Sequence, residues 1–461
     1  MGCGILTTYP QIATIAGVQG LVVYGLSSAL PLMMFAFAGP AIRKRCPEGF
    51  VLTEWVRHRF GTVAGLYLAF FTIATMYLYM VAELSALQLA VTSLTGMDAL
   101  PAMIVECAVT TIYTFFGGFH TSFSTDIIQG VMVTLLLVIC AIAMGTNIDI
   151  DRSLIGPSGL TKGTTLGWQL IYILPVAVAS NDCFLSGFWL RTFASRNDKD
   201  LFIACGVATF ITLVFLVFVG CSGLLAAWSG LWSADSDVDG SSTFFIILLQ
   251  MPAWVVGFVL VFTVALSTAA FDSLQSAMAS SISNDVFRNK LPLIWVRVIV
   301  VLVMVPSIVV ALKAPDILQI YLISDLISAA VVPVLFLGLS DKYFFFISGW
   351  EVVISGLGGL LSVFIFGAIY YDSALEGARL MILQNGLYVD DWSAFGAFVV
   401  APFGGLVFGA VTLLIRASIR KLMGKKAFVN GWDERDYKSE GDSESAIVIP
   451  VGPRKTYEVD A

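Results

Sequence analysis

The sequence predicts an all-α, multi-pass membrane protein with about twelve transmembrane helices. Of its 461 residues, 58% are hydrophobic and only 12% are charged, whereas soluble domains carry about 25% charged residues. The mean hydropathy is +0.89. So much apolar surface needs lipid as its solvent, and we therefore expect the chain to lie in a lipid bilayer. The composition excludes a soluble enzyme, a nucleic-acid-binding protein and a disordered protein.

Apolar runs along the chain predict the individual helices, because a crossing needs about 20 apolar residues. The stretch 244–251 is too short to cross and is expected to be re-entrant or interfacial. The expected spans cover 4–23, 24–42, 61–94, 100–116, 127–145, 166–190, 201–228, 252–283, 291–312, 317–339, 350–371 and 395–415. A pair of glycines, Gly117 and Gly118, predicts a turn after the fourth span.

Lysine and arginine between the spans predict the orientation. The loops after the second, sixth and eighth spans, and the segment after the last span, are rich in these residues, and the alternate loops are poor in them. The positive-inside rule places the basic segments in the cytosol of a plasma-membrane protein. Residues 1–417 then form the transmembrane domain, and the polar stretch 418–461 is expected to be a disordered cytosolic tail.

The first span contains a predicted break at 7–11. Pro10 removes an amide donor and clashes with the preceding turn. The carbonyls of Thr7 and Pro10 are then positioned to face a cation, and Tyr9 and Gln11 lie beside them. A simple proline kink is the alternative interpretation.

A second break is predicted at 179–183, where five small or polar residues follow Pro175 in mid-span. The sixth span is the first of a possible second five-span unit and runs opposite to the first span. Breaks at matching places in two inverted halves are typical of transporters, which bind ions and substrate near mid-membrane. Asp182 is the acidic residue at this break.

A third break is predicted at 266–276. Ala269, Asp272, Ser273 and Ser276 recur at spacings of three and four, which places them on one stripe of a helix. A bare carboxylate at mid-bilayer costs about 2.5–3.5 kcal/mol, so Asp272 is expected to bind a cation or a proton. A hydrogen bond from Asp272 to a neighbouring helix is the alternative.

Three more acids, Glu83, Glu106 and Asp325, fall within the spans without an evident basic partner there. Intramembrane acids are functional candidates by default, although a protonated, hydrogen-bonded acid is a fair alternative for Glu83 and Glu106. Neither a nucleotide-binding motif nor a metal-ligand spacing occurs. We therefore expect no cofactor, and no metal beyond a transported Na⁺.

Five segments carry a resemblance to a known family. They are 53–61, 115–126, 188–196, 271–286 and 323–333. The chain resembles the solute:sodium symporter superfamily, and most closely the urea active transporters of fungi and plants. The similarity covers roughly residues 4–415.

The resemblance implies a five-plus-five inverted repeat with broken first and sixth helices. Repeat one covers about 1–147, repeat two about 164–340, and extra helices about 348–417. It further implies a sodium site built from Thr7, Pro10, Ala269, Asp272 and Ser273.

Three departures qualify this resemblance. Asp272 stands where relatives commonly have serine or threonine, so either Na⁺ or H⁺ is expected as the coupling ion. Leu190 replaces a glutamine. The family usually has one more helix before the broken first one, which predicts a truncated gene model or an impaired paralogue.

Together these features predict a secondary active symporter, not an enzyme, that takes up urea or a related small polar solute. The expected substrate residues are Tyr9, Gln11, Asp182 and Asp325. A symporter for another small polar metabolite is one alternative. A transporter-like sensor that signals through the cytosolic tail is the other.

Overall fold

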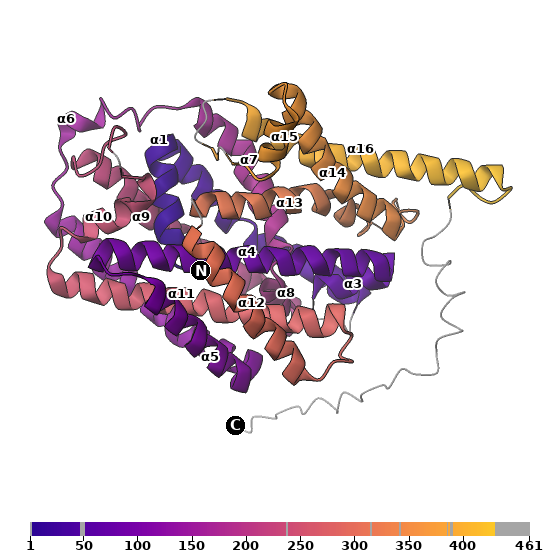
Figure 1. The fold of residues 1–461 in the computed structure, drawn as a ribbon, viewed down its shortest axis with the longest axis horizontal. Helices are drawn as coiled ribbons and strands as arrows, with labels where there is room; N and C mark the ends of the chain where they lie inside the picture. Colours follow the sequence, from indigo (N-terminus) through magenta and orange to yellow (C-terminus); the bar gives the residue numbers. More distant parts are fainter. Residues whose placement is uncertain are drawn as a thin grey trace.

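The computed structural model describes residues 2–46, 51–236, 238–313, 316–340, 343–384, 386–387 and 391–428, without the side chains of 113, 115–127 and 293. The described chain is a bundle of helices with no strand (Figure 1). In chain order the elements are α1 (Ile5–Ala29), α2 (Leu32–Arg45), α3 (Leu52–Phe60), α4 (Thr62–Thr95), α5 (Leu100–Asn147), α6 (Arg152–Ile155), α7 (Thr165–Asp182), α8 (Ser186–Ala194), α9 (Asp198–Trp228), η1 (Gly240–Ser242), α10 (Thr243–Leu248), α11 (Ala253–Ser281), η2 (Ile282–Val286), α12 (Leu293–Lys313), α13 (Ile317–Leu337), α14 (Gly349–Tyr370), α15 (Ala374–Met381) and α16 (Ser393–Leu422).

The predicted all-α membrane fold is confirmed. The described residues contain nine helices that are long and apolar enough to cross a membrane, or ten if α7 and α8 form one broken crossing. The predicted count of twelve, the inverted repeat and the boundary between transmembrane domain and tail stay predictions. Residues 429–461, most of the expected tail, lie outside the described residues.

The first break lies at Gly17, and its predicted place at 7–11 is wrong. Residues 5–16 are helical through Pro10, and the backbone leaves the helix at Gly17, with φ 62° and ψ −156°. Residues with a Cβ rarely adopt this conformation. A Cβ at Gly17 would also overlap the carbonyl oxygen of Leu160. The next amide, on Val18, donates to that same oxygen at 2.9 Å.

The second predicted break is confirmed in place. Helix α7 ends at Asp182, α8 begins at Ser186, and the two are bent by 62°. Pro175 lies within α7, one and a half to two turns before its end, without interrupting it. The break therefore follows directly after the small and polar run.

The third predicted break is absent, because α11 runs without interruption through 266–276. Its hydroxyl groups bond to their own helix instead of replacing backbone partners: Thr268 donates to the Val264 carbonyl at 2.8 Å and Ser276 to the Ser273 carbonyl at 3.1 Å. Polar side chains bonded in this way leave the helix intact. The predicted turn at Gly117 and Gly118 is also wrong, since both lie inside the single helix α5. Glycine is tolerated within membrane helices.

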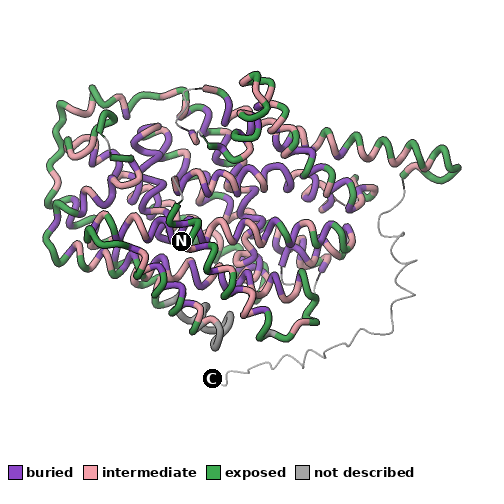
Figure 2. Tube along the Cα trace, viewed as in Figure 1, coloured by how far each residue is buried: buried purple, intermediate pink, exposed green. Residues whose placement is uncertain are grey.

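Long helices α4, α11 and α13 form the middle of the bundle in Figure 1, with α14, α15 and α16 together at one side. Buried residues concentrate in that middle, and the outer faces and the end of α16 are exposed (Figure 2). The outward-facing residues include large apolar side chains such as Phe70, Phe210 and Ile369. Such a surface suits contact with lipid tails. The N-terminal residues lie inside the bundle, where Cys3 contacts Glu83 of α4.

Candidate functional site

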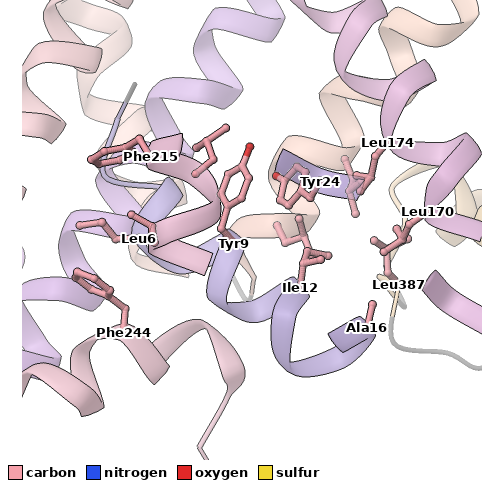
Figure 3. Close-up of a cluster of buried hydrophobic side chains, with 14 of the residues drawn as sticks. Leu6, Tyr9, Ile12, Ala16, Tyr24, Leu170, Leu174, Phe215, Phe244 and Leu387 are labelled. Atoms are coloured by element: carbon pink, nitrogen blue, oxygen red, sulfur yellow. The ribbon is translucent and has the colours of Figure 1, made fainter. Parts of the chain in front are cut away.

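Two tyrosines face each other across the reversal at Gly17. Tyr9 and Tyr24 would lie about 22 Å apart in a straight helix, yet their rings stack with centroids 4.1 Å apart and planes 6° from parallel. Figure 3 shows the two rings pointing toward one another from separate helical segments. Helix α1 is therefore a hairpin that gathers two phenols in the buried middle of the bundle.

Two buried acids lie beside these tyrosines. Asp182 is the last residue of α7, at the confirmed break. Asp325 lies in the third turn of α13. Their side chains are only 7% and 5% exposed. Ser324 Oγ donates to Asn181 Oδ1 at 3.0 Å, so a hydrogen bond between their chain neighbours joins the two helices.

Hydrogen bonding extends from this junction to a third tyrosine. The Asn181 side-chain amide donates to the hydroxyl of Tyr79 on α4. Ser328 Oγ donates to the backbone carbonyl of Asp325 at 2.8 Å, and not to the Asp325 carboxylate. The Asp325 Oδ1 atom makes no hydrogen bond to any described residue. An acceptor buried without a donor is costly, at about 1–3 kcal/mol.

The two acids form an electronegative site. Asp182 lies close enough to disfavour a negative charge on Asp325. Both act electrostatically on Tyr9 and Tyr79, and Asp325 also acts on Tyr24. Among the described residues, no lysine or arginine forms an ion pair with either acid. Like charges in a low-dielectric interior are unfavourable unless a cation or proton joins them.

Gln11 lies apart from these acids and has a bridging role. Its Nε2 lies 3.3 Å from Asp239 Oδ1 and 3.4 Å from Asp316 Oδ1. Asp316 also caps α13 by accepting from the Leu318 amide at 2.9 Å. Gln11 thus joins α1 to the start of α13 and to the segment before η1, whereas Tyr9, Asp182 and Asp325 come together.

The expected cation ligands fall into two groups. Thr7 Oγ1 donates to the Gly4 carbonyl at 2.7 Å. The Pro10 carbonyl faces Gly223 of α9, where a Cβ would overlap it. Helix α1 packs mainly on α9 and α7. Small residues let two membrane helices approach this closely.

The second group lies on α11, which packs mainly on α5 and α4. Asp272 is fully buried and Ala269 is half-buried. Arg191 of α8 reaches this place, with its Nη2 atom 3.4 Å from Ser273 Oγ. The guanidinium group of Arg191 therefore lies beside Ser273, the chain neighbour of Asp272. That the two groups together bind Na⁺ stays a prediction.

Sequence reasoning named Tyr9 but missed the other tyrosines of the site, which are Tyr24, Tyr79 and Tyr321. Tyr79 lies one helical turn before Glu83, and Tyr321 lies one turn before Asp325. Residues at this spacing share a helix face, so the paired pattern was a readable signal. Tyr24 gave no such signal, because only the reversal at Gly17 brings it to Tyr9.

Comparisons with known proteins identify the family. The model of the sodium:solute symporter family matches residues 10–154. A spermidine transporter of Candida albicans is 57% identical over 432 residues, which cover 92% of this chain and 83% of that protein. The chain belongs to the sodium:solute symporter family.

More distant relatives of this symporter are named as urea transporters. A probable urea active transporter of Schizosaccharomyces pombe is 29% identical over 42% of this chain and 32% of its own length. The urea–proton symporter of Oryza sativa is 25% identical over 56% of this chain and 34% of its own. The solved structure of a Na⁺-coupled sialic acid symporter matches with a TM-score of 0.61 and 15% identity, covering 89% of each chain. The last match supports the fold alone.

These findings confirm the predicted resemblance and a multi-pass membrane symporter rather than an enzyme. The family supports coupling to Na⁺ or H⁺ and transport of a small polar solute. Urea, the predicted substrate, has support only from the distant relatives.

Proposed function

We propose that this symporter takes up a linear polyamine, such as spermidine, across the plasma membrane, driven by a Na⁺ or H⁺ gradient. The observation that carries the proposal is the buried pair Asp182 and Asp325, which has no basic partner among the described residues. A polyamine brings ammonium groups to such a pair and neutralises it. The relationship to a spermidine transporter supports the same substrate class.

The tyrosines suit this cargo. Ammonium groups are attracted to the faces of aromatic rings, and Tyr9, Tyr24 and Tyr79 all interact electrostatically with Asp325. The methylene groups between the ammonium groups are apolar and pack against the same rings. Acids and aromatic faces in one place therefore match both parts of a polyamine.

Urea is the second candidate. The amide of Asn181 and the hydroxyls of Ser324 and Tyr79 offer a neutral donor and acceptor set of the kind that urea would bind. Urea carries no charge, however, and would not neutralise the acid pair, which would then need a proton or another cation. The site favours a cationic substrate for this reason.

The coupling-ion site stays a prediction. Asp272 and Ser273 are the expected ligands on α11. Arg191 lies within hydrogen-bonding distance of Ser273 and would compete with a cation for the Ser273 hydroxyl. A change of the ion dependence of uptake in Asp272→Asn would support a role for that carboxylate in coupling. An unchanged dependence would exclude it.

A signalling role through the tail is the remaining alternative. A chain that ends after residue 428 separates the two functions: a transporter keeps its substrate flux, whereas a sensor loses its signal. Flux that depends on the tail would count against a purely transporting role.

Uptake measurements test the substrate. Labelled spermidine and labelled urea are offered to yeast cells that lack their own carriers and express the wild type, Asp182→Asn, Asp325→Asn or the control Asp149→Asn. Asp149 is an exposed acid in the loop after α5. We expect saturable spermidine uptake that falls ~10-fold or more in the two buried variants and is unchanged in the control at equal protein abundance. Urea uptake that spermidine does not inhibit, with no spermidine uptake, would overturn the proposal.

A further inference from the structure

A second pair of buried acids lies next to the first and is not used by the proposed substrate site. Glu83 of α4 and Glu106 of α5 are 4% and 5% exposed, and their charges act on each other. Glu83 is well satisfied: its Oε2 accepts from the Cys3 amide at 2.7 Å, and its Oε1 accepts from the Tyr321 hydroxyl at 3.0 Å. Its role in the fold is clear from these bonds.

Glu106 differs sharply from Glu83. Within the part of the chain that the structure describes, both of its carboxylate oxygens are buried without a geometrically good hydrogen bond, and so is the hydroxyl of Ser267 on α11. Ser267 lies close enough to act on the Glu106 carboxylate. The only nearby donor given by these contacts is the Ser267 hydroxyl itself, which leaves the two Glu106 oxygens short of donors among the described residues, although buried polar groups in native proteins are nearly always paired.

Tyrosines connect this place to the first acid pair. The rings of Tyr79 and Tyr321 meet edge to face, with centroids 4.7 Å apart. Tyr79 and Glu83 are four residues apart on α4, and so are Tyr321 and Asp325 on α13. Side chains at this spacing lie about 5–6 Å apart along one face. Tyr321 therefore lies between Glu83, to which its hydroxyl donates, and Asp325, which is one helical turn farther along α13.

From this arrangement we propose that Glu106 and Ser267 form a second ammonium subsite, which holds the far end of a polyamine whose other end lies at Asp182 and Asp325. The inference rests on the proposed function and adds to it the length of the cargo. A primary ammonium group has three N–H donors, which match the two Glu106 oxygens and the Ser267 hydroxyl. A bare metal cation usually takes a fuller shell of oxygens than these three.

A series of amines of increasing length tests the subsite. Butylamine, putrescine and spermidine carry one, two and three amino groups, and each is measured as a competitor of labelled spermidine. In the wild type we expect the apparent affinity to rise along the series. In Glu106→Gln we expect spermidine to lose ~10-fold or more in apparent affinity, while butylamine is unchanged, because only the longer amine reaches the lost charge.

Ser267→Ala provides a second variant that keeps the size of the buried side chain. We expect a loss in the same direction but smaller, since one neutral acceptor is removed rather than a charge. Ser307→Ala is the matched control. Ser307 is also fully buried in a membrane helix, but its hydroxyl donates to its own helix, at the Val303 carbonyl, at 2.8 Å.

Different outcomes separate this inference from the proposed function. If Asp325→Asn abolishes amine uptake while Glu106→Gln keeps the wild-type preference for length, the subsite is wrong and the substrate class stands. If Glu106→Gln loses its dependence on Na⁺ or pH but keeps that preference, Glu106 holds the coupling ion and the inference is wrong. If no amine is transported by the wild type, both fail. An equal loss for all three amines would show a structural role instead.

Discussion

Charged side chains in two regions of this symporter differ in how many hydrogen-bond partners the chain gives them. The acidic interior comprises Asp182, Asp325, Glu83 and Glu106, which lie in the buried middle of the bundle. The basic end is the region where α3, the start of α4, η2 and the segment before α14 meet. It comprises Arg57, Arg59 and Arg416.

Every arginine of the basic end is held by fixed partners. Arg59 is fully buried and donates to the carbonyls of Phe344, Phe345 and Ile347 at 3.1–3.4 Å. Arg416 pairs with Glu351 at 2.7 Å. Arg57 donates to backbone carbonyls of η2, which continues α11. Burial lowers the pKa of its guanidinium, and the negative charge of the nearby Asp285 raises that pKa.

Two acids of the interior differ from these arginines, because Asp325 and Glu106 keep carboxylate oxygens that accept no hydrogen bond from the described residues. A charged group that several bonds hold within the chain contributes to the fold, whereas a carboxylate whose oxygens accept few bonds is suited to a ligand that binds and leaves. The comparison therefore predicts that variants at the basic end lose folded protein, and that variants in the acidic interior lose transport.

Arg59→Met should have the largest effect on stability. It removes three hydrogen bonds that a fully buried guanidinium donates, one of them to the buried carbonyl of Ile347. Hydrogen bonds of charged groups contribute about 1.5–3 kcal/mol each, so we expect a loss of about 3–5 kcal/mol. Thermal unfolding in detergent, followed by size-exclusion chromatography, measures it. Arg152→Met, at the exposed start of α6, is the control. A melting temperature within two or three degrees of the wild type would break the comparison.

Asp325→Asn should give the opposite result. Loss of one buried charge opposite a cationic substrate costs about 2–5 kcal/mol of binding, which is roughly 30-fold or more in apparent affinity. The same change removes the repulsion with Asp182, so the melting temperature without substrate should not fall. Uptake and thermal unfolding are measured on the same preparation. Parallel losses of both would contradict the distinction drawn here.

Gly17→Ala sharpens the comparison, because it disturbs the interior without altering its charge. The alanine meets both an unfavourable φ and the Leu160 carbonyl, and we expect a cost of about 1–3 kcal/mol. Gly206→Ala in α9 is the matched control, since a Cβ there meets nothing within 4 Å. It should be neutral or stabilising by about 0.5–1 kcal/mol. Equal melting temperatures for the two variants would argue against the strained reversal.

Ser348→Ala should have the smallest effect. Ser348 and Glu351 form a capping box at the start of α14, and loss of the cap costs about 1 kcal/mol. Glu351 keeps its ion pair with Arg416 in this variant, so uptake at equal abundance should be unchanged. A loss of transport larger than the loss of folded protein would mean that the basic end does more than hold the fold.

The sequence was sufficient for the membrane class and for the acids. Asp182 and Asp325 are recognisable because a carboxylate in an apolar run is rare and costly, and the run of small and polar residues marks the bend after Asp182. Hydropathy could not place the reversal at Gly17. The apolar pattern continues straight through it, and the deciding contact with Leu160 comes from a distant part of the chain.

The sequence also could not predict which helices bring their polar side chains together. Thr7 and Pro10 are expected to join Asp272 and Ser273, which stays a prediction; the sequence did not show that α1 and α11 have different principal neighbours. Which face of a membrane helix meets which partner depends on packing, and nearly all faces here are apolar. The hydrogen-bonding hydroxyls of α11 made an intact helix resemble a broken one.

The hairpin of α1 has a consequence for how the chain tolerates variation. The contact between Tyr9 and Tyr24 depends on the absence of a side chain at Gly17. A saturation scan of the gene should thus score this position as intolerant as the carboxylates themselves, although it offers no functional group, and codon changes there would be scored as loss of uptake.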